Sequence, residues 1–171
     1  MALKRRPQAV QVESGHFKYL WAAYRRSCFA AFPDYTEGLS RDDFVQRLSD
    51  GIRDLIWHGG EAYIMIAPTP YGVIPVGLAV VEQAMPPGCR RQAQPQAIWF
   101  PEASPRNKLE AGLELVLKLK KDALVLIWAR EATWTYLAHL CDFGALRPTG
   151  KIRGFWQDGS DAMLYQSRAK E

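Results

Sequence analysis

Hydrophobic and polar positions change their period several times along the chain, and each period predicts an element. A weak alternation over Ala9–Glu13 predicts a short first strand. The segment from about His16 to Ala31 has a helical period, and a second helix begins at Ser40, where Ser40 and Asp43 resemble a capping box. The stripes that we expect these two helices to bury are Phe17, Leu20, Trp21, Tyr24 and Cys28 in the first, and Phe44, Leu48, Ile52 and Leu55 in the second.

Strand signals come next. The runs Glu61–Ala67 and Val73–Glu82 are separated by a turn sequence rich in proline and glycine, which predicts an antiparallel hairpin. The polar, proline-containing stretch from Met85 to Pro95 predicts a loop. Ala97–Phe100 then predicts a short buried strand.

A long helix is predicted directly after that strand. Ser104 suits the N-cap and Pro105 the first helical position, and apolar residues recur at i, i+4, i+7 and i+8 from Leu109 onward. Ala123–Ala129 reads ALVLIWA, the pattern of a fully buried strand. The remaining expected elements are a helix over Thr133–Phe143 ended by Gly144, and a hairpin of Lys151–Gln157 with Ala162–Gln166.

The predicted order is therefore β-α-α-β-β-β-α-β-α-β-β. It indicates an α/β (α+β) protein with a mixed, mostly antiparallel sheet and helices on both faces. The two strands that flank the long helix, at Ala97 and Ala123, imply one parallel crossover. Strand ends that diverge at such a crossover form a cleft in which ligands tend to bind.

Length and composition are those of one folded domain over residues 1–171, with a basic N-terminal tail of about residues 1–8. Cys28, Cys89 and Cys141 have no metal-ligand spacing, so we expect reduced thiols, an intracellular setting and no metal. We expect no signal peptide and no membrane span. The net charge of +4 is mild and the tryptophans fall on apolar faces, so no specific nucleic acid is predicted.

The entry to the long helix is a candidate anion site. Arg106 and Lys108 place positive charge, and Asn107 a polar amide, where the first-turn backbone N–H groups and the helix dipole favour an anion such as a phosphate. An ordinary capped helix with a solvated basic first turn explains the same residues.

The element order resembles the GNAT superfamily of acyl-CoA-dependent N-acyltransferases. In that family an Arg/Gln-x-x-Gly-x-Gly/Ala loop holds the CoA pyrophosphate, and the matching residues here run from Arg106 to Ala111. Arg106 and Ala111 agree with the motif, whereas Leu109 stands where the family usually has glycine. The resemblance implies acetyl-CoA as cofactor, an amine as acceptor, and cofactor contacts from Arg106, Asn107, Lys108, Leu109 and Ala111.

The resemblance also implies catalytic positions. A carboxylate at the end of the fourth strand often serves as base in the family, and Glu102 stands there, although a solvated loop acid is the alternative. The tyrosine that often acts as acid aligns with Leu140 or Cys141. Tyr136 and His139 are the candidate substitutes, and a packed or surface histidine is the alternative for His139.

Three segments further resemble small GNAT-like proteins of tailed bacteriophages: FPEASPRNKLEA, CDFGALRPTGKIR and WQDGSDAMLYQ. Some of those proteins are acetyltransferases and others are structural or internal virion proteins. Two functions therefore stay open, an N-acetyltransferase with a degenerate cofactor loop and a non-catalytic virion or interaction protein. The resemblance implies a cytoplasmic or virion location, with an amine acceptor or virion proteins as partners and a homo-oligomer as a possible state.

Overall fold

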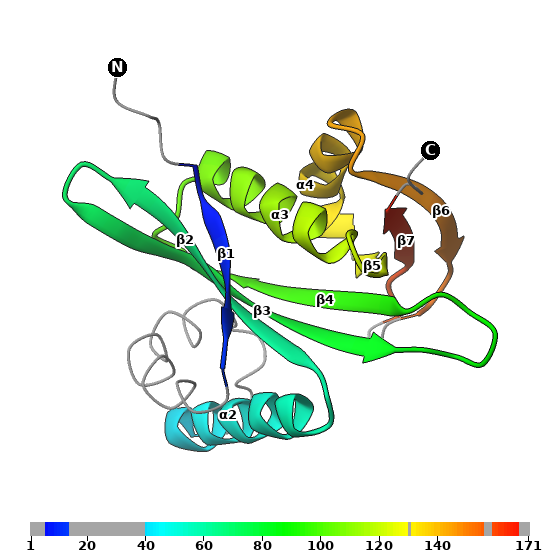
Figure 1. The fold of residues 1–171 in the computed structure, drawn as a ribbon, viewed down its shortest axis with the longest axis horizontal. Coiled ribbons are helices and arrows are strands. Elements are labelled where there is room, and N and C mark those ends of the chain that lie inside the picture. The colour runs from blue at the N-terminus through cyan, green and yellow to red at the C-terminus, as the bar shows by residue number, and fades with distance from the viewer. Residues whose placement is uncertain (1–5, 14–39, 130, 156–158, 168–171) are drawn as a thin grey trace.

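The computed structural model describes residues 6–13, 40–129, 131–155 and 159–167. Within them seven strands form one sheet in the order β1-β2-β3-β4-β5-β7-β6 (Figure 1). The strands are β1 (Gln8–Val12), β2 (Glu61–Thr69), β3 (Gly72–Ala84), β4 (Gln92–Trp99), β5 (Leu124–Ala129), β6 (Leu146–Ile152) and β7 (Ala162–Ser167). The described helices are α2 (Arg41–Trp57), α3 (Pro105–Leu119) and α4 (Glu131–Asp142). The first helix expected, at His16–Ala31, lies outside the described residues.

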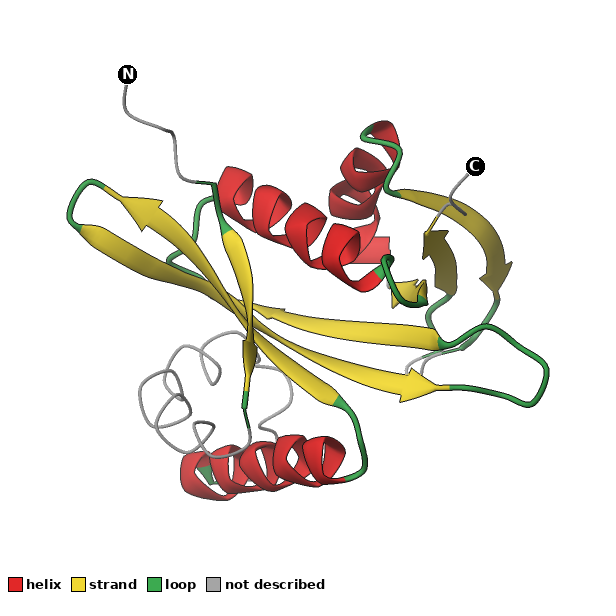
Figure 2. Cartoon of the chain, in the orientation of Figure 1, coloured by secondary structure: helices red, strands yellow, loops and turns green. Residues whose placement is uncertain are grey.

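Helices cover both faces of the sheet, as the sequence predicts. Figure 2 shows α3 and α4 on one side of the strands and α2 on the other. The core is divided accordingly. Ala111, Leu115 and Leu119 of α3 pack on one face, while Ile52 of α2 packs with residues such as Leu78 and Ile98 on the other. A third cluster joins α3 and α4 to β5, β6 and β7.

Local chemistry accounts for α3. The Ser104 hydroxyl accepts a hydrogen bond from the backbone N–H of Asn107 at 3.2 Å, and Pro105 occupies the first turn. Both features were expected from the sequence. Because the buried residues recur at helical spacing, one side of α3 faces the sheet and the α4 cluster, and the other side is more exposed.

The crossover is confirmed. β4 and β5 are parallel, and they pair only at their beginnings, where Gln92 faces Leu124 and Ala93 faces Val125. Toward its C-terminal end β4 stays paired with β3 as far as Trp99, while β5 stays paired with β7 as far as Ala129. The two strands therefore diverge in the direction of the α3 N-terminus.

Two strands begin several residues earlier than expected. The stretch Met85–Pro95 is not all loop, because β4 begins at Gln92 and Pro95 faces Val81 of β3. The last hairpin begins at Leu146, not at Lys151, since β6 covers Leu146–Ile152. In each case a proline lies inside the strand. Pro148 is tolerated because β6 is an edge strand, and a bulge follows it.

Candidate functional site

The divergence of β4 and β5 leaves an opening in the middle of the sheet. We call it the splay and define it by Gln96 and Ala97 of β4 with Ile127 and Trp128 of β5. Successive strand residues point to opposite faces, and both Gln96 and Ala97 are exposed although β4 is a central strand. Solvent thus reaches the splay from both faces. Beyond Ala93 and Val125, the described parts of β4 and β5 form no ladder with each other.

The beginning of α3 stands at the same end of the sheet. Pro105 contributes no N–H, Ser104 already accepts from Asn107, and Lys108 donates its N–H to the Ser104 carbonyl at 3.0 Å. The amide of Arg106 precedes the first intrahelical hydrogen bond and points toward the N-terminal end. This end of α3 thus combines the positive end of the helix dipole with an exposed arginine side chain.

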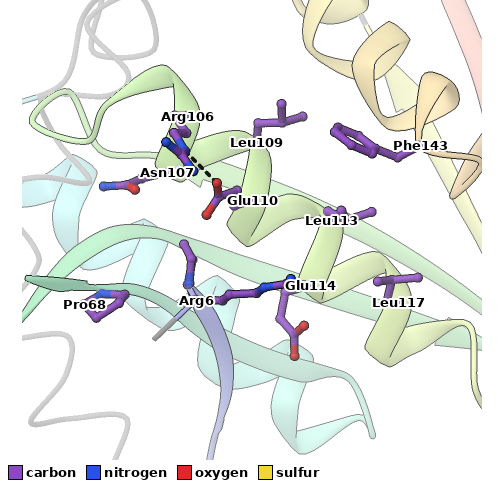
Figure 3. Close-up of a pocket in the computed structure, with 11 residues that line it drawn as sticks. Arg6, Pro68, Arg106, Asn107, Leu109, Glu110, Leu113, Glu114, Leu117 and Phe143 are labelled. Atoms are coloured by element: carbon purple, nitrogen blue, oxygen red, sulfur yellow. Dashed lines mark hydrogen bonds and ion pairs between the residues drawn. The ribbon is translucent and has the colours of Figure 1, made fainter. Parts of the chain in front are cut away.

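A groove of about 840 Å³ runs along the exposed side of α3 (Figure 3). Apolar residues of α3 and Phe143 lie on one side of it, and Arg6 and Pro68 lie on the other. The lining residues are Arg6, Pro7, Pro68, Arg106, Asn107, Leu109, Glu110, Leu113, Glu114, Leu117 and Phe143. Arg106, Asn107 and Leu109 therefore line one groove, and their contact with a cofactor stays a prediction.

Arg106 does not stand alone in the groove. Its Nε lies 2.7 Å from Oε1 of Glu110, one turn along the helix, and the Arg106 side chain is 76% exposed. The Glu110 carboxylate raises the pKa of Arg106, so the guanidinium is always charged. The same carboxylate places a negative charge close to the position an anion would take.

The other candidate cofactor residues have different surroundings. Ala111 is completely buried in the core between α3 and the sheet. Leu109 is partly buried, packs against the cluster that joins α3 to α4, and also lines the groove. Lys108 is half-buried and is not among the groove residues. The small Ala111 side chain thus allows close packing, and its buried methyl group is out of reach of a ligand.

Glu102 and His139, the two candidate catalytic residues whose side chains are described, lie on separate elements. Glu102 is exposed in a turn in which the N–H of Ala103 donates to the carbonyl of Phe100 at 3.1 Å, just before the α3 N-cap. His139 is an exposed residue of α4 with Nδ1 3.8 Å from an Asp142 oxygen, and it does not line the groove. Tyr136 lies on α4, and its side chain is not described. The roles of Glu102, Tyr136 and His139 stay predictions.

Sequence reasoning missed two acidic groove residues, Glu110 and Glu114. Their spacing from Arg106 by four and eight residues could have revealed them, because residues at i, i+4 and i+8 share a helix face. Nothing in the local sequence indicates that Arg6, Pro68 and Phe143 join them, since these come from separate parts of the chain.

Within the described residues, no cluster of three or more His, Cys, Asp or Glu side chains could hold a metal ion. Cys89 is exposed and Cys141 half-buried, and both are free thiols. None of the described helices combines the length and the apolar character that crossing a bilayer requires.

No protein-family model and no curated protein matches this sequence. Solved structures do match. One is RimL, a ribosomal L7/L12 alpha-N-protein acetyltransferase in complex with coenzyme A. It has a TM-score of 0.66 at 12% identity, with 98% of this chain and 97% of that chain covered. The chain has the GNAT fold.

Two further structures have the same GNAT fold. A ribosomal-protein-alanine N-acetyltransferase from Brucella melitensis has a TM-score of 0.58 at 17% identity, with 93% of this chain and 98% of its own covered. A GNAT superfamily phosphinothricin acetyltransferase from Sinorhizobium meliloti, in complex with AcCoA, has a TM-score of 0.58 at 16% identity, with coverages of 95% and 88%. At these identities the likeness establishes the fold.

The residues of this GNAT fold suit part of an acyl-CoA molecule. The α3 N-terminus and Arg106 suit an anionic phosphate, and the splay is open on both faces for an extended arm. Glu110 and Glu114 oppose an anion farther along the groove, and the Leu109 side chain occupies space near the first turns. The fit is therefore best at the helix end and at the splay.

Proposed function

We propose that this protein is an acyl-CoA-dependent N-acyltransferase that acetylates an amine. The observation that carries this proposal is the splay, which opens a central sheet to solvent directly beside the N-terminus of α3. A β-sheet core normally has no such opening, because the backbone groups on both sides would lose their partners. The acetyltransferase structures with bound CoA or AcCoA that share the fold support the same proposal.

The residues of this chain have the following roles in the proposal. Arg106 and the first-turn amide would hold the pyrophosphate, and the facing edges of β4 and β5 at the splay would hold an extended arm as an added strand. Acetyl-CoA, when bound, supplies an activated thioester carbonyl. Glu102 would accept a proton from the attacking amine, and Tyr136 or His139 would supply a proton to the thiolate that leaves. One C–N bond forms and one C–S bond breaks, so the step is balanced.

A second function is favoured by Leu109 and Glu110. Leu109 packs into the core cluster between α3 and α4, and Glu110 already neutralises Arg106. If Leu109 packing and the Arg106–Glu110 ion pair replace cofactor contacts in this loop, the protein is a non-catalytic interaction protein. A virion location is the prediction that belongs to this second function.

Calorimetry with acetyl-CoA decides between the two functions. The enzyme proposal expects about micromolar affinity for the wild type and about a tenfold loss in Arg106→Ala, the usual size for one charge-assisted contact. Arg53→Ala is the matched control, because Arg53 is also an exposed arginine paired with a carboxylate, Asp50, but lies on α2 across the sheet. No heat at millimolar acetyl-CoA, or an equal loss in both variants, would reject acyl-CoA binding at this site.

A further inference from the structure

Two aromatic rings stack beside the splay on the face of the sheet opposite α4. Trp128 of β5 and Phe155, which follows β6, have ring centroids 5.1 Å apart and an interplanar angle of 10°. Ile127 and Ala129 pack against the α3–α4 cluster, so the intervening Trp128 points to the other face. Phe155 is 44% exposed. The pair therefore forms an apolar wall at the exit of the splay.

The chain holds Phe155 in this position with specific contacts. Gly154 has a φ of 59°, in the left-handed region, and its N–H donates to Oδ1 of Asp161 at 3.0 Å. Oδ2 of the same carboxylate lies 2.7 Å from Nζ of Lys151. The Asp161 carboxylate thus ties the end of β6 to the start of β7 and orients the residue that follows Gly154.

The described part of the β6–β7 hairpin beside this wall carries more positive than negative side chains. In residues 146–155 and 159–167, the cations are Arg147, Lys151 and Arg153, and the carboxylate is that of Asp161, which pairs with Lys151. Arg147 faces Gln166 across the β6–β7 ladder, on the same face as Trp128. An acceptor that carries several positive charges would be repelled here, whereas a flat apolar group would be stabilised by the exposed ring.

We propose that the Trp128–Phe155 wall selects the acyl acceptor, an amine that carries an aromatic group and no second positive charge. This inference rests on the proposed function, because it assigns the acceptor side of the same splay. Phe155 contacts the aromatic group of the acceptor, and Asp161 is a positioning residue that acts through Gly154. Polyamines are rejected.

The test uses 2-phenylethylamine, n-butylamine and spermidine as acceptors, with acetyl transfer followed by release of the CoA thiol. We expect the wild type to favour 2-phenylethylamine over the other two by about tenfold in kcat/KM. Phe155→Ala should remove about three- to tenfold of that preference, the range for one aromatic contact, and leave n-butylamine unchanged. Tyr71→Ala, which removes a fully exposed aromatic ring from the distant β2–β3 turn, is the control.

Asp161→Asn provides a second variant that does not alter the ring. It should raise KM for 2-phenylethylamine while KM for acetyl-CoA and kcat for n-butylamine stay as in the wild type, a split that a general loss of folding would not give. A preference for spermidine, or an equal loss for all three amines in Phe155→Ala, would overturn the proposal.

Calorimetry with each amine separates this inference from the proposed function. If acetyl-CoA does not bind but 2-phenylethylamine still binds more tightly than n-butylamine, the acyltransferase function is rejected. The binding of an aromatic amine at the Trp128–Phe155 wall is then supported. If acetyl-CoA binds and the three amines bind equally, the wall fails and the acyltransferase function stands.

Discussion

At the residue scale, the first two turns of α3 contain opposing contributions to anion binding. Arg106 and the helix dipole favour a bound anion, and the Glu110 carboxylate opposes it. The Leu109 side chain lines the groove and also packs against the α3–α4 core cluster. The contributions of Arg106, Leu109 and Glu110 can be removed separately, because each depends on one side chain.

Replacing Glu110 with glutamine removes the opposing charge and releases Arg106. We expect acetyl-CoA affinity to rise by about three- to tenfold at low salt, as is usual for one exposed charge close to an anion, and the gain to shrink at high salt. Calorimetry at two salt concentrations measures this. Asp50→Asn on α2 is the control, since that carboxylate is also paired with an arginine and should leave affinity unchanged.

Leu109→Gly tests whether this side chain blocks the groove. The glycine should cost about 1 kcal/mol of helix stability, and the lost packing about 1 kcal/mol more, because Leu109 is only partly buried. CoA affinity should increase. Leu109→Ala gives most of the opening without the glycine penalty, so thermal melts of both variants with and without CoA separate the two effects. A loss of 2–5 kcal/mol, roughly that of a core truncation, with no gain in affinity would identify Leu109 as a structural residue.

Glu102→Gln tests the predicted base. If Glu102 accepts the amine proton, turnover should fall by about two to four orders of magnitude. The acetyl-CoA affinity should barely change, because the carboxylate acts on the amine. Steady-state rates measured beside calorimetry answer the question, and unchanged turnover would remove Glu102 from the mechanism.

At the scale of elements, the β6–β7 hairpin depends on a carboxylate. Lys151 and the Gly154 N–H donate hydrogen bonds to the Asp161 carboxylate. These bonds lower the pKa of Asp161 below its value in the unfolded chain. A depressed carboxyl pKa contributes stability above its unfolded value of about 4, and this stability is lost as pH falls through the folded pKa. We therefore expect the Tm of the wild type to exceed that of Asp161→Asn at pH 7. The gap should close below pH ~4, and a gap that stays constant with pH would contradict this assignment.

The strand elements also show where local sequence patterns mislead. The sequence predicted a loop over Met85–Pro95 and a last hairpin beginning at Lys151. The structure instead has Pro95 within β4 and Pro148 within β6. A proline lacks only one donor, and a strand that is unpaired on one side can omit it. Strand pairing is a tertiary property, and the local sequence does not contain it.

At the scale of the whole molecule, the sequence predicted the order of the described elements and the single parallel crossover, because hydrophobic period and capping residues determine both. It placed Arg106, Asn107 and Leu109 near one site. It did not predict that Ala111 is buried or that His139 lies outside the groove. It also did not predict that Arg6, Pro68 and Phe143 line the groove with α3, because these residues meet only when the separate segments pack.

The central claim is that acyl-CoA binds at the α3 N-terminus and passes through the splay. Amide chemical-shift mapping of the 171-residue chain with CoA tests this location directly. We predict saturable shifts at Arg106 and Asn107, together with Gln96 and Ala97 of β4 and Ile127 of β5, while the amides of α2 stay in place. Saturable shifts confined to another surface, or no shifts at millimolar CoA, would contradict the account.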